Sequence, residues 1–476
     1  MMSNEIKSDH EKADAAGVFW IAGGKEVSGA VEYTDDNGYN LRLSSFCFMP
    51  VQVTVLDDRA LQFSNDPAHI AADFSPRVIL GRLDDGSLVT FMDAHMQPGP
   101  EFSIHTRQRF TGKQRLHGAH VSGEDQGVTA IRWTWPIPES AISWATEPEV
   151  AGPVPGRIGP WTHGGNAGLT FSSHEISSLG TLTQDIQLSS AQLLGLWTQK
   201  EPPSPLLTEV FIEDHGWCLY VPRGDEEQGI LRRSSFLPLG DLTVEHLATW
   251  LPFAAKIDPF PYIANSRSGV IQVDAQVLVT ALEGLHRRLH TKARPFQELS
   301  ARAVERAMDE ARAAGVRALT DEGFSDDAMA NETLRNVLNH VDQPTYHERI
   351  VQLAAPVCEI APGVCGPDLD LWVKIVKKIR NDQSHQLVNR FGGTELSSYF
   401  VAMISCRWIL TLRILLELTD SNELKAALRK AQSFMFALAN MDEEHLWDPP
   451  GALEMFRERS KASPSEPLSP APVGDG

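Results

Sequence analysis

The stretch that decides the fold of the second half of this chain reads Leu371-Trp372-Val373-Lys374-Ile375-Val376-Lys377-Lys378-Ile379-Arg380-Asn381-Asp382-Gln383-Ser384-His385. Its apolar residues recur every three or four positions, which predicts an amphipathic helix packed within a helical domain. Asn381 and His385 are four positions apart and share a helix face, and the long side chain of Arg380 reaches the same place. Such a set can hold a phosphate and move a proton, because guanidinium binds phosphate and histidine titrates near neutrality.

We therefore take Arg380, Asn381 and His385 as candidate catalytic residues. A short arginine and histidine pairing on a polar helix turn also arises by chance, and would then form only a solvated face. The surroundings favour the functional interpretation, since the set follows an amphipathic run and precedes a long apolar helix. Candidate RNA-binding residues beside it are Lys377, Lys378 and Arg407.

The overall charge limits the kinds of partner that the whole chain can bind. Its 476 residues allow two or three domains, and the formal net charge is −20. That balance argues against a general basic nucleic-acid-binding protein and against attachment to an anionic membrane surface. The segment 371–430 differs, because it holds ten Lys and Arg against five Asp and Glu. A local basic site therefore remains compatible with the composition.

Cysteine usage and hydropathy predict a protein of the reducing cytoplasm. Five scattered cysteines without a Cys-x-x-Cys pair suggest neither a zinc ribbon nor a disulfide framework. The first sixteen residues carry no apolar signal-peptide core. The most apolar segment, near 397–418, is interrupted by Arg407 and Arg413, which predicts a core helix and no membrane span. We expect no metal and no cofactor, because His117 and His120 lack further ligands at metal-binding spacing.

The first half of the chain is patterned as strands. Alternating runs surround the turn residues Asp35–Gly38, and a second pair flanks Asp85 and Gly86, which predicts hairpins. Beyond Asp274 the periodicity becomes helical. The sequence thus predicts an α+β, multidomain chain in which a β-rich, sandwich-like N-terminal domain precedes an all-α helical bundle. The expected segments are a disordered N-terminus at 1–16, the β-rich domain at 17–240, a connector at 241–270, the helical domain at 271–447 and a disordered, proline- and serine-rich tail at 448–476.

Motifs in both halves resemble those of one family of anti-phage defence proteins. The chain resembles ApeA-type proteins, in which an ApeA N-terminal domain precedes a C-terminal HEPN ribonuclease domain. The likeness covers about residues 17–418. The stretches that carry it are Gly17-Val18-Phe19-Trp20, Gly29-Ala30-Val31, Leu41-Arg42-Leu43, Ile79-Leu80-Gly81, Leu116-His117-Gly118-Ala119-His120, Tyr346-His347-Glu348-Arg349-Ile350, Trp372, Arg380-Asn381 and His385.

The resemblance implies a metal-independent endoribonuclease that acts in abortive defence. It further implies a β-rich sensing or regulatory domain, a phage-derived trigger, and a homodimer in which two motifs share one cleft. RNA supplies its own nucleophile, the 2′-OH, so such an enzyme needs a base, an acid and a cation at the phosphate. Asp382 inside the motif is a departure that could repel phosphate or point outward. The apolar residues expected to leave a stripe for a second copy are Phe400, Met403, Ile404, Trp408, Leu412, Leu415 and Leu416.

Two other interpretations stay open at the level of sequence. One is a HEPN-type RNA-binding or dimerisation module without cleavage activity, and the other is a carbohydrate-binding β-sandwich with a helical adaptor. Glu283 and His286-Arg287-Arg288 could line an RNA cleft, although a solvated helix face is the simpler prediction. Arg407 and Arg413 have a structural or an RNA-facing role, because an unpaired buried arginine is costly. The tryptophans expected in the β core are Trp20, Trp133, Trp135, Trp144 and Trp217.

Overall fold

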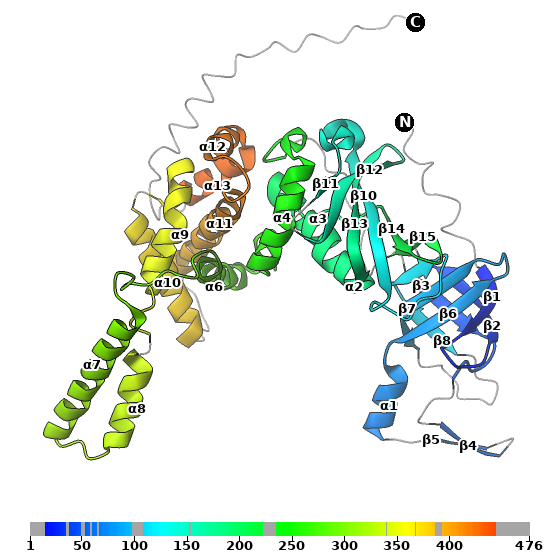
Figure 1. The fold of residues 1–476 in the computed structure, drawn as a ribbon, viewed down its shortest axis with the longest axis horizontal. Coiled ribbons are helices and arrows are strands. Elements are labelled where there is room, and N and C mark those ends of the chain that lie inside the picture. The colour runs from blue at the N-terminus through cyan, green and yellow to red at the C-terminus, as the bar shows by residue number, and fades with distance from the viewer. Residues whose placement is uncertain are drawn as a thin grey trace, which may run out of the picture. The chain divides into compact units, whose positions relative to one another are not determined.

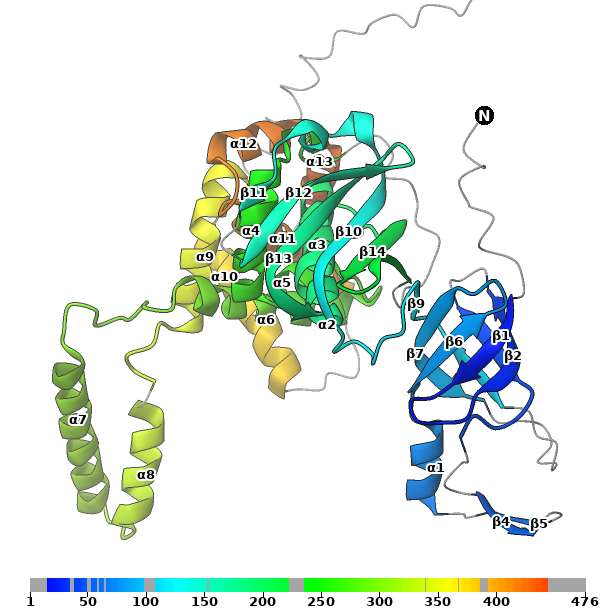
Figure 2. The same ribbon diagram turned by 45° about the vertical axis from the view of Figure 1, so that its right-hand side comes forward.

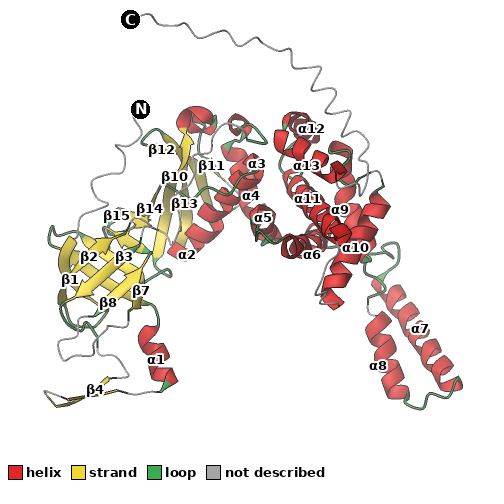
Figure 3. Ribbon diagram, turned by 180° about the vertical axis from the view of Figure 1, so that it is seen from behind, coloured by secondary structure: helices red, strands yellow, loops and turns green. Residues whose placement is uncertain are grey.

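The computed structural model divides the chain into two compact units, which meet in sequence at Ala255 and Lys256. It describes residues 15–34, 38–48, 53–57, 60–63, 66–97, 108–151, 154–221, 235–338, 340–366, 368–385 and 393–443. Strands occur only in the described part of the first unit, and the described part of the second is helical (Figures 1 and 3). The tail expected at 448–476 and residues 1–14 lie outside these ranges, whereas Ala15 and Ala16 already belong to the first strand.

The first unit is built on one antiparallel sheet with the strand order β11-β12-β13-β10-β14-β15-β9-β7-β6-β1-β2-β3-β8. A separate pair of short strands consists of β4 (Val53–Asp57) and β5 (Ala60–Phe63). The strands of the large sheet are β1 (Ala15–Trp20), β2 (Val27–Tyr33), β3 (Tyr39–Leu43), β6 (Arg77–Leu83), β7 (Leu88–Met96), β8 (Arg109–Gly112), β9 (Arg115–His117), β10 (Gly127–Pro138), β11 (Val150–Ala151), β12 (Gly156–His163), β13 (Asn166–Ser178), β14 (Leu207–Ile212) and β15 (Gly216–Val221).

One end of this sheet closes into a barrel, because β8 pairs with both β3 and β7. Phe19, Tyr39, Phe91 and Phe110 are fully buried in its core. The predicted β-rich domain is therefore confirmed, but its strands form a barrel continued by an open sheet instead of two stacked sheets. The difference arises at the pairing of β7 with β8, a contact between distant segments that local alternation does not specify.

The two predicted hairpins form as expected. Strands β2 and β3 pair from Tyr33 opposite Tyr39 onward, and β6 pairs with β7. Gly86 in the second turn has a φ of 87°, a left-handed conformation that glycine adopts without steric cost. The turn chemistry at Gly86 therefore fits the register of the second hairpin.

A continuous helical stretch packs on the open part of the sheet. It comprises α2 (Leu179–Thr181), the π-helical η3 (Leu182–Leu188) and α3 (Ser189–Thr198). The amide of Gln187 donates to Thr208 Oγ1 of β14 at 2.7 Å, and the indole of Trp250 donates to Ser189 O at 2.7 Å. The remaining helices of this unit are α1 (Pro67–Phe74), η1 (Glu139–Ala141), η2 (Trp144–Thr146), η4 (Leu239–Asp241) and α4 (Val244–Ile257).

Three of the five tryptophans expected in the β core are fully buried. These are Trp133, Trp135 and Trp144, and they lie where the helices cover the sheet. Trp217 differs, because it is exposed and stacks on the guanidinium of Arg132 at 4.1 Å. Core packing therefore explains most of the tryptophans in this unit.

The second unit confirms the predicted helical domain. Its long helix α11 is buried on nearly all sides, and Trp408, Leu412 and Leu415 are enclosed within one copy. The other four of the seven apolar residues expected to pack within the domain and leave a stripe are partly exposed, namely Phe400, Met403, Ile404 and Leu416. The helices are α5 (Phe260–Asn265), α6 (Ile271–Leu289), α7 (Ala301–Asp321), α8 (Asp327–Leu338), α9 (Tyr346–Ile360), α10 (Leu369–His385), α11 (Gly393–Leu415), α12 (Ser421–Lys430) and α13 (Gln432–Glu443).

Helices α7 and α8 form a hairpin between α6 and α9, in which the two helices lie side by side (Figure 2). Arg294 and Asp342 form an ion pair at the base of this excursion, and the backbone N–H of Phe296 donates to the same carboxylate at 3.3 Å. The chain segments before α7 and after α8 are therefore held together by these contacts. None of the described helices is long and apolar enough to cross a membrane.

Candidate active site

Helix α10 carries the motif, and its position follows from its own sequence pattern. The carboxylate of Asp368 accepts hydrogen bonds from the backbone N–H groups of Asp370 and Leu371 at 2.8 and 3.2 Å, which caps the first turn. Trp372 and Val376 are buried against the unit, whereas the lysines of the helix face outward. The burial of one face thus fixes which residues of the last turns reach the surface.

Arg380 is held in place by two neighbouring helices. Its Nη2 lies 2.9 Å from Glu283 Oε2 on α6, and its guanidinium lies 4.8 Å from the centre of the Tyr346 ring on α9. The side chain remains 36% exposed. Asn381 is exposed, and His385 ends the helix. The side chains of Asp382 and His385 lie outside those that the structure describes.

Glu283 is the centre of an ion-pair cluster that joins α6, α9 and α10. Its Oε1 accepts from Arg349 at 2.5 Å and from Arg287 at 2.9 Å, while its Oε2 faces Arg380. Burial alone would raise the pKa of Glu283, but the hydrogen bond from Arg287 and the positive charges around it hold the pKa below its ordinary value. The carboxylate is therefore ionised near neutral pH, and three cations surround one anion.

The first turn of α9 positions Arg349 beside Glu283. Thr345 and Glu348 form a reciprocal capping box, which fixes the first turn of the helix. From that turn the hydroxyl of Tyr346 donates to Val279 O of α6 at 3.1 Å. Burial raises the pKa of Tyr346, so the hydroxyl keeps its proton and the bond persists. Helix α9 is thereby tied to α6, and Arg349 is carried to the buried side of Glu283.

The segment that contains this cluster matches a known family. Residues 277–424 match the family model described as Apea-like HEPN. This segment is therefore similar to Apea-like HEPN domains, and we refer to it as the HEPN domain. The matched residues include Glu283, Arg349 and Arg380, so all three elements of the cluster fall inside the HEPN domain. No curated protein and no solved structure matches the chain.

The structure corrects the prediction that Glu283 and His286 lie on a solvated face of the HEPN domain. Both are buried, whereas Arg287 and Arg288 are exposed. His286 Nε2 lies 2.8 Å from Gln352 Oε1, and burial lowers the pKa of His286 below its ordinary value. A signal was present in the sequence, because Glu283 and His286 continue a stripe whose other members are apolar. Polar residues on such a stripe indicate buried, partnered groups.

The candidate RNA-binding residues separate into two groups. Lys377 and Lys378 are exposed on the same helix as Arg380. Arg407 instead points into the HEPN domain, where its Nη1 donates to Ala264 O at 2.9 Å and to Ser266 O at 2.5 Å. These contacts favour the structural role that the sequence left open for Arg407. Arg413 is likewise largely buried and pairs with Glu417 at 2.7 Å.

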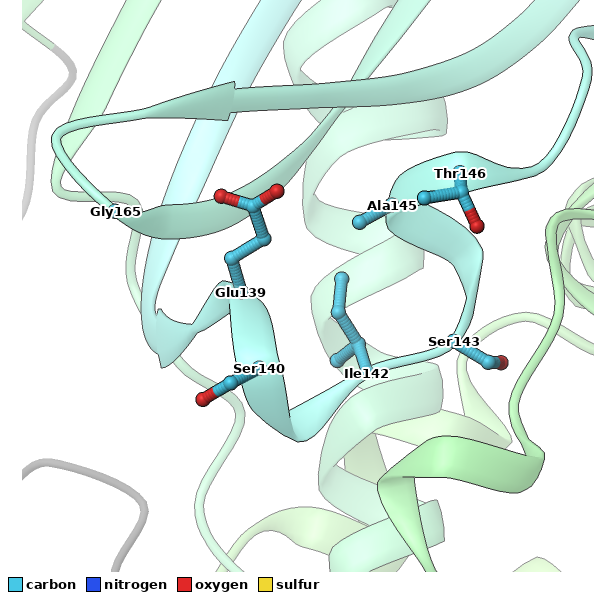
Figure 4. Close-up of a pocket in the computed structure, with 7 residues that line it drawn as sticks. All are labelled: Glu139, Ser140, Ile142, Ser143, Ala145, Thr146 and Gly165. Atoms are coloured by element: carbon cyan, nitrogen blue, oxygen red, sulfur yellow. The ribbon is translucent and has the colours of Figure 1, made fainter.

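Other candidate sites lie in the first unit and bring together no catalytic set. In the part of the chain that the structure describes, no group of three or more His, Cys, Asp or Glu could hold a metal ion. His120 binds Gly81 O at 2.9 Å, and His117 contacts Arg115 at 3.3 Å, so each has its own partner. This unit also has an open pocket with a volume of about 680 Å³. Figure 4 shows the residues around it. It is lined by Glu139, Ser140, Ile142, Ser143, Ala145, Thr146 and Gly165.

Proposed function

We propose that this chain is a metal-independent endoribonuclease of the cytoplasm that acts in abortive defence against phage. The observation that supports it most is the end of α10, where Arg380, Asn381 and His385 fall within six residues inside the Apea-like HEPN domain. Arg380 pairs with Glu283, which also binds Arg287 and Arg349. In a chain of net charge −20, this gathering of three arginines is a local feature that can attract phosphate.

The proposed reaction uses the ribose of the substrate as the nucleophile. His385 takes the proton from the 2′-OH, and the resulting oxygen attacks the adjacent phosphorus. Arg380 binds the non-bridging oxygens as negative charge develops on them, and Asn381 orients the phosphate or the imidazole. The bond from phosphorus to the 5′-oxygen breaks, and that oxygen leaves with a proton from an acid. The products are a 2′,3′-cyclic phosphate and a 5′-hydroxyl.

A second copy supplies the second proton-transfer group in this scheme. One motif holds a single histidine, whereas the reaction needs a base and an acid. Helix α6 exposes Val273 and Val277, at 48% and 40%, and Arg287 lies two heptads after Val273 on the same side of the helix. An apolar stripe thus leads to the arginine cluster. We propose that this face of α6 forms part of a homodimer in which the two motifs share a cleft.

A non-catalytic HEPN module is the second candidate. The ion pair between Arg380 and Glu283 favours it, because a braced arginine can also serve structure alone. In either case the β-rich unit is the proposed sensing or regulatory part, and a phage-derived component is the proposed trigger.

A cleavage assay on total RNA tests the proposal. Wild-type protein should cut RNA, and His385→Ala should abolish cutting while the melting temperature stays at that of the wild type. Arg380→Ala should also abolish cutting, but it removes one partner of Glu283, so its fold must be checked separately. Lys374→Ala, an exposed change on the same helix, is the matched control. RNA cleavage by His385→Ala at the wild-type rate would reject the site.

A further inference from the structure

Three arginines form ion pairs with Glu283, and their side chains differ in solvent exposure. The side chain of Arg349 is 8% exposed, that of Arg380 is 36% exposed, and that of Arg287 is 58% exposed. Arg349 is therefore the buried anchor of the carboxylate, while Arg287 and Arg380 stand at the surface on either side of it.

All three arginines pair with the one carboxylate of Glu283. Arg349 and Arg287 share Oε1 of Glu283, and Arg380 takes Oε2. His286, on the same helix, has a pKa lowered by burial and adds little positive charge near neutral pH. Because Arg349 is enclosed, Arg287 and Arg380 are the two of these three arginines that a ligand at the surface can meet. One carboxylate holds both of their guanidinium groups.

We propose that Arg287 and Arg380 together form a phosphate subsite for single-stranded RNA, with Glu283 as its positioning residue. This inference rests on the proposed function, since it takes RNA as the substrate of the Arg380 motif. Arg287 then contributes a second guanidinium to a phosphate, from α6, while Arg380 contributes the first from α10. Glu283 touches no substrate and acts by holding the two cations at the separation that one phosphate group spans.

Neighbouring arginines on α6 give a matched pair of variants. Arg288 is exposed like Arg287 and carries the same charge, but Glu283 pairs with Arg287. Arg287→Ala and Arg288→Ala therefore remove equal charge from adjacent positions. A general electrostatic effect would weaken RNA binding equally in both, whereas a built subsite would be sensitive to Arg287 alone.

The test measures binding of a fluorescein-labelled 2′-O-methyl oligonucleotide, which lacks the nucleophile and cannot be cleaved. For the full-length protein, Arg287→Ala should weaken binding roughly tenfold and reduce the slope of log affinity against log salt by about 0.7, as for one lost phosphate contact. Arg288→Ala should stay within about twofold of the wild type. Glu283→Gln should lower kcat for RNA cleavage more than it raises KM, because both cations remain but their spacing is no longer held.

Equal affinities for Arg287→Ala and Arg288→Ala would overturn the subsite, whatever happens to cleavage. The proposed function fails by a different result, namely a wild-type protein that cleaves no RNA. If that protein still bound the oligonucleotide through Arg287, the subsite would stand and the catalytic assignment would fall. A melting temperature measured for each variant separates loss of binding from loss of fold, and Arg287, being mostly exposed, is the safer of the two changed positions.

Discussion

Arg407→Met is expected to destabilise the HEPN domain without weakening RNA binding. Arg407 lies on α11 with 13% of its side chain exposed, and its guanidinium donates to Ala264 O and Ser266 O at the end of α5. Its Nη2 also lies 3.6 Å from Asp274 Oδ2. Methionine keeps most of the apolar stem and removes only these polar contacts. The substitution therefore isolates the role of the guanidinium.

The expected loss follows from the groups left behind. Each hydrogen bond from a charged donor contributes about 1.5–3 kcal/mol, and water replaces part of this at a helix end near the surface. We expect a loss of about 2–3 kcal/mol in the free energy of unfolding. For a unit of this size, that corresponds to a decrease of roughly 4–12 °C in melting temperature. Far-ultraviolet circular dichroism of the full chain would follow the helical transition.

Two comparisons make this prediction decisive. Lys378→Ala, on the exposed side of α10, should change stability by no more than about 0.5 kcal/mol. The affinity of Arg407→Met for the 2′-O-methyl oligonucleotide should equal that of the wild type. A variant that melts normally but loses RNA affinity would refute the structural assignment of Arg407 and restore its role in RNA binding.

Three further predictions concern acid stability, metal dependence and the dimer. Burial lowers the pKa of His286 in the folded state, so below about pH 6.5 the unfolded chain binds the proton more readily and the free energy of unfolding decreases as the pH decreases. In urea unfolding at a series of pH values, His286→Gln should make this decrease shallower. An unchanged dependence on pH would show that His286 is not its source. Cleavage should survive excess EDTA, and a strict need for Mg²⁺ with 3′-hydroxyl products would indicate another mechanism. Excess His385→Ala protein mixed with the wild type should lower cleavage, since a cleft shared by one copy of each holds only one of the two histidines; full activity in a sedimenting monomer would exclude the shared cleft.

The periodicity of the sequence predicted those helices and hairpins whose formation depends mainly on residues close together in the chain. Helix α10 covers the stretch that its amphipathic pattern indicated, and the strands on either side of both predicted turns pair with each other. Helix α9 continues to Ile360 although Pro356 lies inside it. Helices α12 and α13 are separated at Ala431.

Contacts between distant segments were the part that the sequence could not supply. The closure of the barrel depends on the pairing of β7 with β8, and β12 forms although Gly159 and Pro160 lie inside it. The candidate site was likewise predictable from the sequence only in part. The spacing of Arg380, Asn381 and His385 was evident, but the three arginines around Glu283 come from three helices. Which helix faces lie together is a tertiary property that no single helix pattern encodes.

The central claim, that the α10 motif cleaves RNA through the ribose 2′-OH, is tested most directly with a DNA oligonucleotide that contains one ribonucleotide. The wild-type protein should cut it once, on the 3′ side of that ribonucleotide, and leave a 2′,3′-cyclic phosphate. His385→Ala should leave it intact. Cleavage of the same oligonucleotide made entirely of DNA, or equal cleavage by His385→Ala, would contradict the account.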